Sequence, residues 1–152
     1  MFHESMIAPC GLHCALCSHR LKDVPPCPGC KGPDENKPEC CRVRCRIVHC
    51  TLRSNLEGGF CNECEKYPCS DVMEKEIRYA NAYPMLESPI GNLAFIAQNG
   101  MDAFLETEKK RWSCPRCGAV ICVHDGVCSA CGAVYTNRIP SCTDSKDSAC
   151  GG

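Results

Sequence analysis

The stretch that decides the fold reads Cys114-Pro115-Arg116-Cys117-Gly118 and then, after a spacer, Cys128-Ser129-Ala130-Cys131-Gly132, with the spacing C-x2-C-x10-C-x2-C. In each half the first cysteine begins a tight turn, and the second lies where backbone amides point at sulfur. The glycine that follows can adopt a positive φ angle. Two such knuckles that face each other supply four thiolates about 2.3 Å from a tetrahedral ion. The spacing therefore predicts one metal site formed by Cys114, Cys117, Cys128 and Cys131.

The segment between the knuckles fits a small β structure. Residues 119–123 are rich in β-branched side chains and suit a strand, and Val127 and the pair Val134-Tyr135 could supply its partners. This combination predicts a zinc ribbon. The same geometry can hold a single iron ion, as in rubredoxin-like modules, so iron stays an alternative. Cys122 and His124 lie between the knuckles, and we interpret both as non-ligands because four better-placed thiolates are available.

Cysteine usage limits what can hold the chain together. The chain has 152 residues, of which 19 are cysteine, and a formal net charge of −1. It reaches 44% hydrophobic residues only with those cysteines included, so a large apolar core is excluded. Most cysteines form pairs two residues apart, which can clamp a metal ion but would make a strained ring as a disulfide. We therefore predict metal binding instead of disulfides, in a reducing compartment.

Targeting signals and membrane spans are not expected. The first ten residues contain no basic region followed by an apolar run of signal-peptide length. No stretch of the chain approaches 18 consecutive apolar residues. The predicted location is therefore cytoplasmic. The chain is also too short for a (β/α)₈ barrel, which takes about 200 residues or more.

The distribution of cysteines divides the chain into four segments. Residues 1–69 carry twelve cysteines among many prolines and glycines, which predicts an irregular zinc-knuckle module. Residues 70–112 contain no cysteine and predict a helical segment. Residues 113–135 form the predicted zinc ribbon. Residues 136–152, which include Cys142 and Cys150, are predicted to form a flexible tail. The predicted fold class is a small metal-stabilised α+β protein.

Helix signals are clearest in the cysteine-free segment, where we expect two or three helices. Ser70 or Asp71 could cap the first helix, Ser88-Pro89 begins a second that ends at Gly100, and a third begins near residue 101. A further short helix is predicted over residues 40–56. Apolar residues at helical spacing predict the packed faces: Met73, Ile77 and Ala80 on the first helix, Ile90, Leu93 and Ala97 on the second, and Phe104, Leu105 and Glu108 toward Trp112 on the third.

The N-terminal cysteines supply further candidate ligands. Cys14-x2-Cys17 and Cys27-x2-Cys30 repeat the two-knuckle spacing, so we assign these four cysteines to one site. Cys61-x2-Cys64 has no fourth knuckle to meet, and we pair it with Cys45 and Cys50. A third site would combine Cys10, Cys41 and Cys69 with Cys40 or a histidine.

Spacing alone does not fix which knuckle meets which, so interleaved pairing is equally consistent with the sequence. The predicted load is three zinc ions, or four. An iron–sulfur cluster held by four cysteines stays an alternative for the N-terminal module. Each Cys₄–zinc unit carries a charge of −2, and the basic residues near the cysteines would offset it: Lys31, Lys37, Arg42, Arg44, Arg46 and Arg53 in the N-terminal module, and Lys109, Lys110, Arg111 and Arg116 beside the ribbon.

Catalytic chemistry is not visible in the sequence. Cys10-x3-Cys14-x2-Cys17 has the spacing of a radical-SAM triad, but that chemistry needs a large barrel. The histidines are scattered, and neither a P-loop nor a G-x-G-x-x-G motif occurs. Because all-cysteine ligation is typical of closed, structural zinc sites, we predict that the protein is not an enzyme. Nucleic-acid binding is not supported, because no segment shows a strongly basic recognition element.

Three segments of the chain resemble a known family. They read Met6-Ile7-Ala8-Pro9-Cys10-Gly11-Leu12-His13-Cys14-Ala15-Leu16-Cys17, Cys27-Pro28-Gly29-Cys30 and Cys61-Asn62-Glu63-Cys64-Glu65-Lys66-Tyr67-Pro68-Cys69. They look like the motifs C-G-L-x-C-x2-C, C-x-G-C and C-x2-C-x3-[YF]-P-C of a cysteine-rich prokaryotic domain of unknown function. Some members continue through a similar helix into Arg111-Trp112-Ser113-Cys114.

The resemblance covers about residues 5–118 and implies metal binding. It supports ligand roles for Cys10, Cys14, Cys17, Cys27, Cys30, Cys45, Cys50, Cys61, Cys64 and Cys69. The doubled Cys40-Cys41 departs from the single cysteine of the family pattern, which leaves the ligand at that place open. The family brings no established activity.

Together these patterns predict a zinc-binding protein with several structural Cys₄ sites that serves as a binding or adaptor module for a protein partner. One alternative is an iron–sulfur or rubredoxin-type electron-transfer protein. A second is a metal reservoir or thiol redox sensor, which would use the surplus thiols Cys40, Cys122, Cys142 and Cys150.

Overall fold

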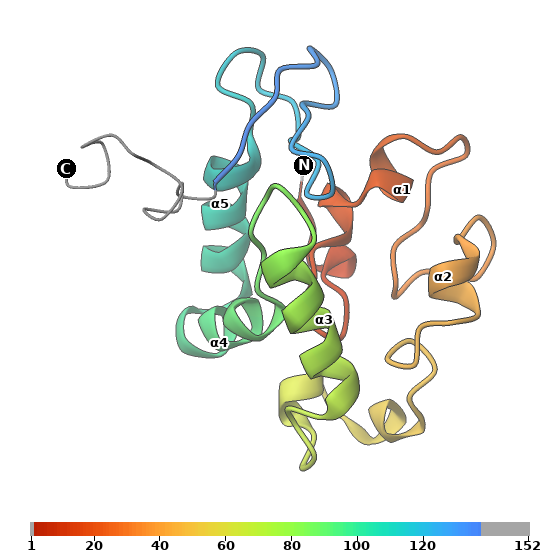
Figure 1. The fold of residues 1–152 in the computed structure, drawn as a ribbon. Helices are drawn as coiled ribbons and strands as arrows, with labels where there is room; N and C mark the ends of the chain where they lie inside the picture. The colour runs from red at the N-terminus through yellow and green to blue at the C-terminus, as the bar shows by residue number, and fades with distance from the viewer. Residues whose placement is uncertain (1, 138–152) are drawn as a thin grey trace, which may run out of the picture.

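A computed structural model describes residues 2–137 of the chain. The predicted tail, with Cys142 and Cys150, lies almost wholly outside this described part. Short 3₁₀ turns and two short helices form the first half, and three longer helices follow (Figure 1). In chain order the elements are η1 (Glu4–Met6), η2 (Cys14–Leu16), α1 (Ser18–Leu21), α2 (Glu39–Arg42), η3 (Thr51–Asn55), η4 (Cys61–Glu63), α3 (Ser70–Asn81), α4 (Pro89–Asn99) and α5 (Met101–Trp112).

Residues 2–137 contain five α-helices and no β-strand. Four isolated antiparallel bridges take the place of a sheet, and three of them lie in the C-terminal segment, at Ser113–Val120, Ile121–Cys128 and Val127–Val134. The strand predicted over residues 119–123 is therefore reduced to single bridges, and the β part of the predicted α+β class is not shown. The short spacer and the two tight turns leave little length for a continuous ladder.

The second and third helices begin and end where the sequence signals lie. The Ser88 side chain accepts a hydrogen bond from the Gly91 amide, and Pro89 occupies the first turn of α4. Gly100 ends α4 with a φ of 91° and connects it directly to α5. The helix α3 begins at Ser70 after Cys69, without a side-chain cap, so the predicted capping by Ser70 or Asp71 is wrong.

The packed face of α3 also differs from the prediction. Val72 is fully buried, whereas Ile77 is 57% exposed and Met73 37% exposed. The helix thus turns the face of Val72, Glu76 and Tyr79 inward, and polar contacts fix that orientation. Both Glu76 carboxylate oxygens accept hydrogen bonds from the start of α4, from Ser88 Oγ at 2.7 Å and Ile90 N at 3.0 Å.

The helix predicted over residues 40–56 forms only at its two ends, as α2 and η3. Between them, side chains form hydrogen bonds with backbone carbonyl oxygens that would otherwise accept hydrogen bonds from helix amides. Arg53 Nη1 donates to the carbonyl oxygens of Ile47 and Val48, at 3.2 and 2.8 Å, and His49 Nε2 contacts that of Arg42. These contacts hold the segment as an irregular loop.

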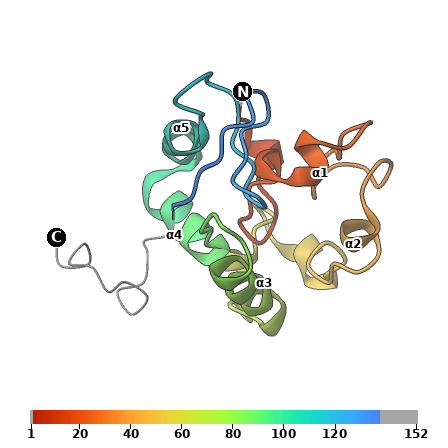
Figure 2. The ribbon, with the colours of Figure 1, turned by 45° about the horizontal axis from the view of Figure 1, so that its top comes forward.

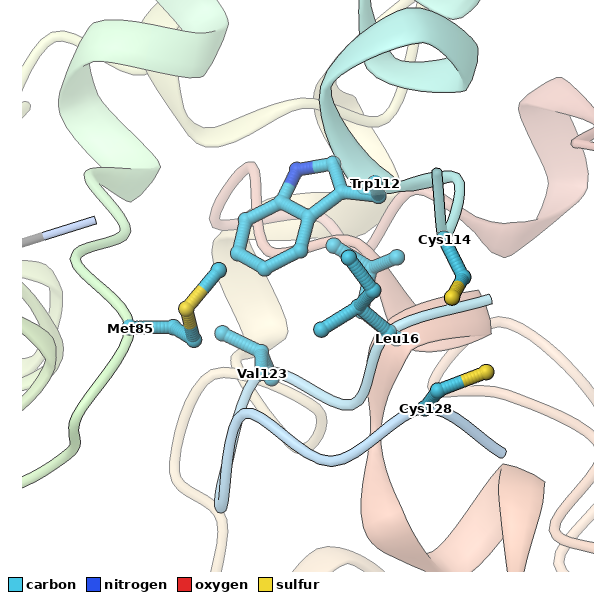
Figure 3. Close-up of a cluster of buried hydrophobic side chains, with 7 residues drawn as sticks. Leu16, Met85, Trp112, Cys114, Val123 and Cys128 are labelled. Carbon is cyan, nitrogen blue, oxygen red and sulfur yellow. The ribbon is translucent and has the colours of Figure 1, made fainter. Parts of the chain in front are cut away.

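The C-terminal segment packs against the start of the chain. Residues 113–137, drawn in teal to blue, continue from the end of α5 and lie beside the red N-terminal segment (Figures 1 and 2). The Val123 amide donates to the Leu16 carbonyl at 2.9 Å. Leu16 and Trp112, both at 0% exposure, share one apolar cluster with Met85, Ile121 and Val123. In Figure 3 Leu16 lies between the Trp112 ring and the side chains of Cys114 and Cys128, so the core reaches the predicted metal site.

A second apolar cluster lies among the N-terminal thiols. Ala8, Ile47 and Val72 form its buried part together with Cys10 and Cys14, and other cysteines surround it. Of the helices that the structure describes, none has the length and apolar character needed to cross a membrane.

Candidate metal centre

The two C-terminal knuckles bring four sulfur atoms together as the spacing predicts. The Sγ atoms of Cys114, Cys117, Cys128 and Cys131 all lie within 4.8 Å of one another. Cys114 and Cys131 are separated by 3.7 Å, and Cys117 and Cys128 by 3.4 Å. A tetrahedral ion with bonds of about 2.3 Å requires sulfur–sulfur separations of about 3.8 Å, whereas a disulfide requires about 2.05 Å. The separations therefore fit a shared metal ion.

Each knuckle has the same backbone turn. The Gly118 amide donates to the Cys114 carbonyl at 2.8 Å, and the Gly132 amide to the Cys128 carbonyl at 3.2 Å. Both glycines have positive φ angles, 80° at Gly118 and 75° at Gly132. The backbone amide of the first cysteine in each turn also donates a hydrogen bond, from Cys114 N to Ala119 O and from Cys128 N to Ala133 O. The repeated pattern places the two knuckles as equivalent halves of one site.

Hydrogen-bond donors near Cys114 and Cys128 favour the thiolate form of these two cysteines. The Tyr135 hydroxyl donates to Cys114 Sγ at 3.1 Å, and this bond together with the backbone amides of Cys117 and Arg116 lowers the pKa of Cys114 to about 6. The backbone amides of Cys131 and Ala130 lower the pKa of Cys128 in the same way. Because metals bind the thiolate, these donors suit a metal site.

The residues between the knuckles have other roles. His124 Nδ1 accepts a hydrogen bond from the Ser18 amide at 3.1 Å, and its Nε2 lies 2.9 Å from the Tyr79 hydroxyl. Burial lowers the pKa of His124 to about 4, so the ring is neutral at pH 7. Cys122 is buried at 1% exposure and does not belong to the four-sulfur group. Both positions therefore agree with a non-ligand assignment.

The N-terminal thiols lie near one another without forming a second group as tight as the first. Among residues 2–137, only the C-terminal group places three or more potential ligand atoms within 4.8 Å of one another. One cavity of about 80 Å³ is nevertheless lined by six of the predicted N-terminal ligands: Cys10, Cys14, Cys17, Cys30, Cys41 and Cys45.

Contacts within this region define two neighbourhoods. In the first, the Cys30 amide donates to Cys14 Sγ at 3.4 Å, and hydrogen bonding with Cys14 raises the pKa of the Cys30 thiol. Cys41 joins this neighbourhood, because its contact with Cys30 raises its own pKa. Cys17 and Cys27 lie close enough to Cys41 for their charges to interact. The structure thus places Cys41 beside the predicted Cys14–Cys30 set.

The second neighbourhood centres on Cys61. Burial and the charges of Cys69, Cys50 and Cys64 together raise the pKa of Cys61 to about 11. Cys10 belongs here as well, because burial and the charges of Cys61 and Cys45 together raise its pKa to about 12. The cysteines assigned to the second and third N-terminal sites therefore lie together, except Cys41. Cys40 is exposed, and its Sγ lies 3.9 Å from both Cys41 Sγ and His19 Nε2.

No disulfide joins any of the cysteines that the structure describes, all of which are free thiols. Two side chains that the sequence analysis did not single out, Lys75 and Tyr135, lower the pKa of individual thiols. Lys75, on the inner side of α3, lines the thiol cavity and lowers the pKa of Cys41 against the raising effects of Cys30 and burial. Tyr135 follows the second knuckle by four residues, where the sequence indicated only a strand. Arg111, expected beside the ribbon, instead donates to the Leu86 carbonyl at 2.8 Å.

Comparisons with models of protein families, with curated proteins and with solved structures find no match to this chain. The resemblance to the cysteine-rich prokaryotic domain therefore stays a prediction, and the geometry of the thiols carries the functional argument.

Proposed function

We propose that Cys114, Cys117, Cys128 and Cys131 hold one zinc ion in a closed structural site of the zinc-ribbon kind. The observation that carries this proposal is the group of four sulfur atoms within 4.8 Å, presented by two equivalent turns. Four thiolates complete a tetrahedral zinc shell and leave no position for a substrate or water. The protein is then a zinc-stabilised binding module for a protein partner, not an enzyme.

The proposal extends to the N-terminal module. Its twelve cysteines hold two further zinc ions, or three, in the neighbourhoods around Cys30 and Cys61. The shared cavity and the mutual charge interactions of these thiols support this extension. Metal binding would lower the pKa values of these N-terminal thiols, because a bound cation stabilises several adjacent thiolates at once. Lys75 and Lys37 supply positive charge beside them.

Elemental analysis of anaerobically purified protein tests the metal assignment. Zinc near three equivalents per chain, with a colourless solution, is the expected result. A majority of iron with strong visible absorption would instead establish the rubredoxin-type or iron–sulfur alternative. Rapid loss of zinc to a mild chelator or under peroxide would favour the reservoir or redox-sensor alternative over a structural role.

A matched pair of variants tests the ligand assignment. Cys131→Ser removes an exposed sulfur of the four-thiolate group, and Cys122→Ser alters a buried thiol outside it. We expect Cys131→Ser to lose one equivalent of zinc and Cys122→Ser to retain full zinc content. Structural zinc contributes about 10–16 kcal/mol of apparent binding free energy, so the first variant should also lose the ordered C-terminal module. Equal zinc content in both variants would contradict the assignment.

A further inference from the structure

A histidine and a thiol meet where α1 lies close to α2. His19 on α1 and Cys40 on α2 are 21 residues apart in sequence, and the two helices are neighbours in both ribbon views (Figures 1 and 2). His19 Nε2 lies 3.9 Å from Cys40 Sγ, which in turn lies 3.9 Å from Cys41 Sγ. Two ligands of a tetrahedral zinc ion, an imidazole nitrogen and a thiolate sulfur, are about 3.6 Å apart. The pair is therefore close to the spacing of two ligands on one ion.

The His19 ring is held in the orientation that a metal ligand needs. Its Nδ1 lies 2.8 Å from Asp23 Oδ2, four residues further along the chain. When Nδ1–H donates to this carboxylate, Nε2 keeps its lone pair and is free to bind an ion on the side of Cys40. Histidines that bind metal almost always donate their other ring N–H to a carboxylate, a backbone carbonyl or water. The contact with Asp23 therefore fixes the tautomer that a metal site requires.

Two further thiols belong to the same unit of backbone as His19. Cys17 immediately precedes α1, and the amides of His19 and Arg20 donate to its sulfur. The Cys27 amide donates to the His19 carbonyl at 3.0 Å, so the knuckle that Cys27 begins is tied to α1. The thiols of Cys17 and Cys27 are also close enough for their charges to interact. These three residues form part of a site that Cys40 can complete from α2.

The doubled Cys40-Cys41 fits a division between two ions. Cys41 contacts Cys30, whose amide donates to Cys14 Sγ at 3.4 Å, and all three line the thiol cavity. Cys40 does not line that cavity and is exposed beside His19. Side chains of adjacent helical residues leave the helix axis about 100° apart, which suits two neighbouring sites. Cys41 then stays with Cys14 and Cys30.

A histidine ligand also limits the negative charge of two neighbouring sites. Three thiolates and one imidazole around Zn²⁺ carry a net charge of −1, whereas four thiolates carry −2. Two adjacent four-thiolate sites would therefore repel each other more strongly than one such site beside a site with an imidazole.

We propose that one N-terminal zinc ion binds in a Cys₃His site with these ligands: Cys17, His19, Cys27 and Cys40. It is one of the N-terminal sites of the proposed function, on which the inference rests. Among residues 2–137 only the C-terminal group places three or more ligand atoms within 4.8 Å of one another, so the ion draws these four ligands together as it binds. Exposed Cys40 has room to change rotamer for this purpose.

Cadmium NMR of the full chain tests whether an imidazole binds the metal. In protein loaded with ¹¹³Cd in place of zinc, an ion bound by three thiolates and one nitrogen resonates upfield of an ion bound by four thiolates. We expect one such resonance, coupled to the ring protons of a single histidine. His19→Gln should abolish that coupling. His49→Gln removes a ring that contacts the Arg42 carbonyl and should leave the coupling in place.

Further variants separate the ligands from their support. Cys40→Ser should lose one equivalent of zinc relative to the wild type. Asp23→Ala keeps all four ligands but removes the carboxylate that holds the ring, so the zinc affinity of this site should fall about tenfold to hundredfold. Glu35→Ala removes another exposed carboxylate of the same module and should leave the affinity unchanged. Because Asp23 is itself exposed, this pair keeps the test informative if a ligand variant does not fold.

The outcomes distinguish this site from the proposed function as a whole. If every ¹¹³Cd resonance lies at the four-thiolate position, without coupling to a histidine, the Cys₃His site is wrong and the proposed zinc sites stand. If cadmium binds at the C-terminal site alone, the N-terminal part of the proposed function fails together with this site. Equal zinc affinity in Asp23→Ala and the wild type would also overturn the inference.

Discussion

Tyr135 Oη lies 3.1 Å from Cys114 Sγ, and this contact ties the last described turn of the chain to the first ligand of the C-terminal site. Cys114 is 2% exposed, so its sulfur has little access to water as an alternative donor. The hydroxyl therefore stabilises the negative charge of the thiolate, whether or not the sulfur also binds zinc. Because Tyr135 lies outside the two knuckles, its role is separable from metal ligation.

Replacement of Tyr135 by Phe should weaken zinc binding without abolishing it. A hydrogen bond to a charged group is worth about 1.5–3 kcal/mol, so we expect the affinity at the C-terminal site to fall at least about tenfold. Competition with a chromophoric chelator measures this change. Tyr79→Phe serves as the comparison, because it removes a hydroxyl that contacts His124 instead of a ligand, and it should lower zinc affinity less than Tyr135→Phe does. Unchanged zinc affinity in Tyr135→Phe would show that the contact does not tune the site.

Gly11 should tolerate no side chain. Its φ is 99°, and a Cβ atom there would lie 2.3 Å from the carbonyl oxygen of Pro89, at the start of α4. Gly59 also has a positive φ, 75°, but nothing lies within 4 Å of the place that a Cβ atom would occupy. Gly11→Ala should therefore lower the free energy of unfolding by about 3 kcal/mol or more, and Gly59→Ala by about 1 kcal/mol. Chemical denaturation of the zinc-loaded variants would check the ranking, which equal losses would contradict.

The Tyr79–His124 hydrogen bond should couple α3 to the C-terminal segment. Its two partners are 45 residues apart in sequence, and the His124 ring is also bonded to Ser18. Tyr79→Phe leaves the buried His124 nitrogen without a partner and should cost about 1–3 kcal/mol. A double-mutant cycle with His124→Ala should give a coupling energy of at least about 0.5 kcal/mol. Additive losses would mean that the two residues stabilise the fold independently.

Glu87 should make stability depend on pH between about 4.5 and 7. Its pKa is raised from 4.5 to about 7 by burial and by Glu108, so in this window the folded chain holds a proton that the unfolded chain has released. Stability contributed by this group is therefore lost as pH rises through the window. Glu87→Gln cannot ionise and should exceed the wild type by up to about 3 kcal/mol at pH 8, with a much smaller difference at pH 5.

Urea denaturation across this pH range measures that difference directly. Comparing variant and wild type at each pH removes the pH dependence of zinc binding, which both chains share. Glu106→Gln changes a residue on the exposed side of α5, and its free energy of unfolding should depend on pH in the same way as that of the wild type. A constant offset between Glu87→Gln and the wild type would show that Glu87 ionises normally in the folded protein.

Local signals in the sequence predicted the bounds of α4, the start of α5 and the C-terminal thiol group. Ser88, Pro89 and Gly100 act within one turn of the residues they cap or end, so their effect can be read without the tertiary structure. The two knuckles are equally local, because each turn closes over five residues. Features formed by residues so close in sequence can be predicted from the local spacing alone.

Longer-range features escaped the sequence for a physical reason. Exposed Ile77 lies on the outer side of α3 because Glu76 is held inward by hydrogen bonds to Ser88 and Ile90, which no helical periodicity encodes. Cys41 lies beside Cys30, although spacing grouped it with Cys10 and Cys69. Which thiols meet depends on how irregular loops cross, and side-chain bonds to backbone carbonyls determine that path.

The pairing of Leu16 with Val123 has a consequence for synthesis. A nascent chain emerges from the ribosome with its N-terminal end first, so Leu16 and its neighbouring thiols are in solution long before the segment that covers them has been translated. The Ser18–His124 bond, which closes the same contact, spans 106 residues. The early cysteines therefore pass through a period without their apolar cover, in which their thiols are open both to metal ions and to oxidants.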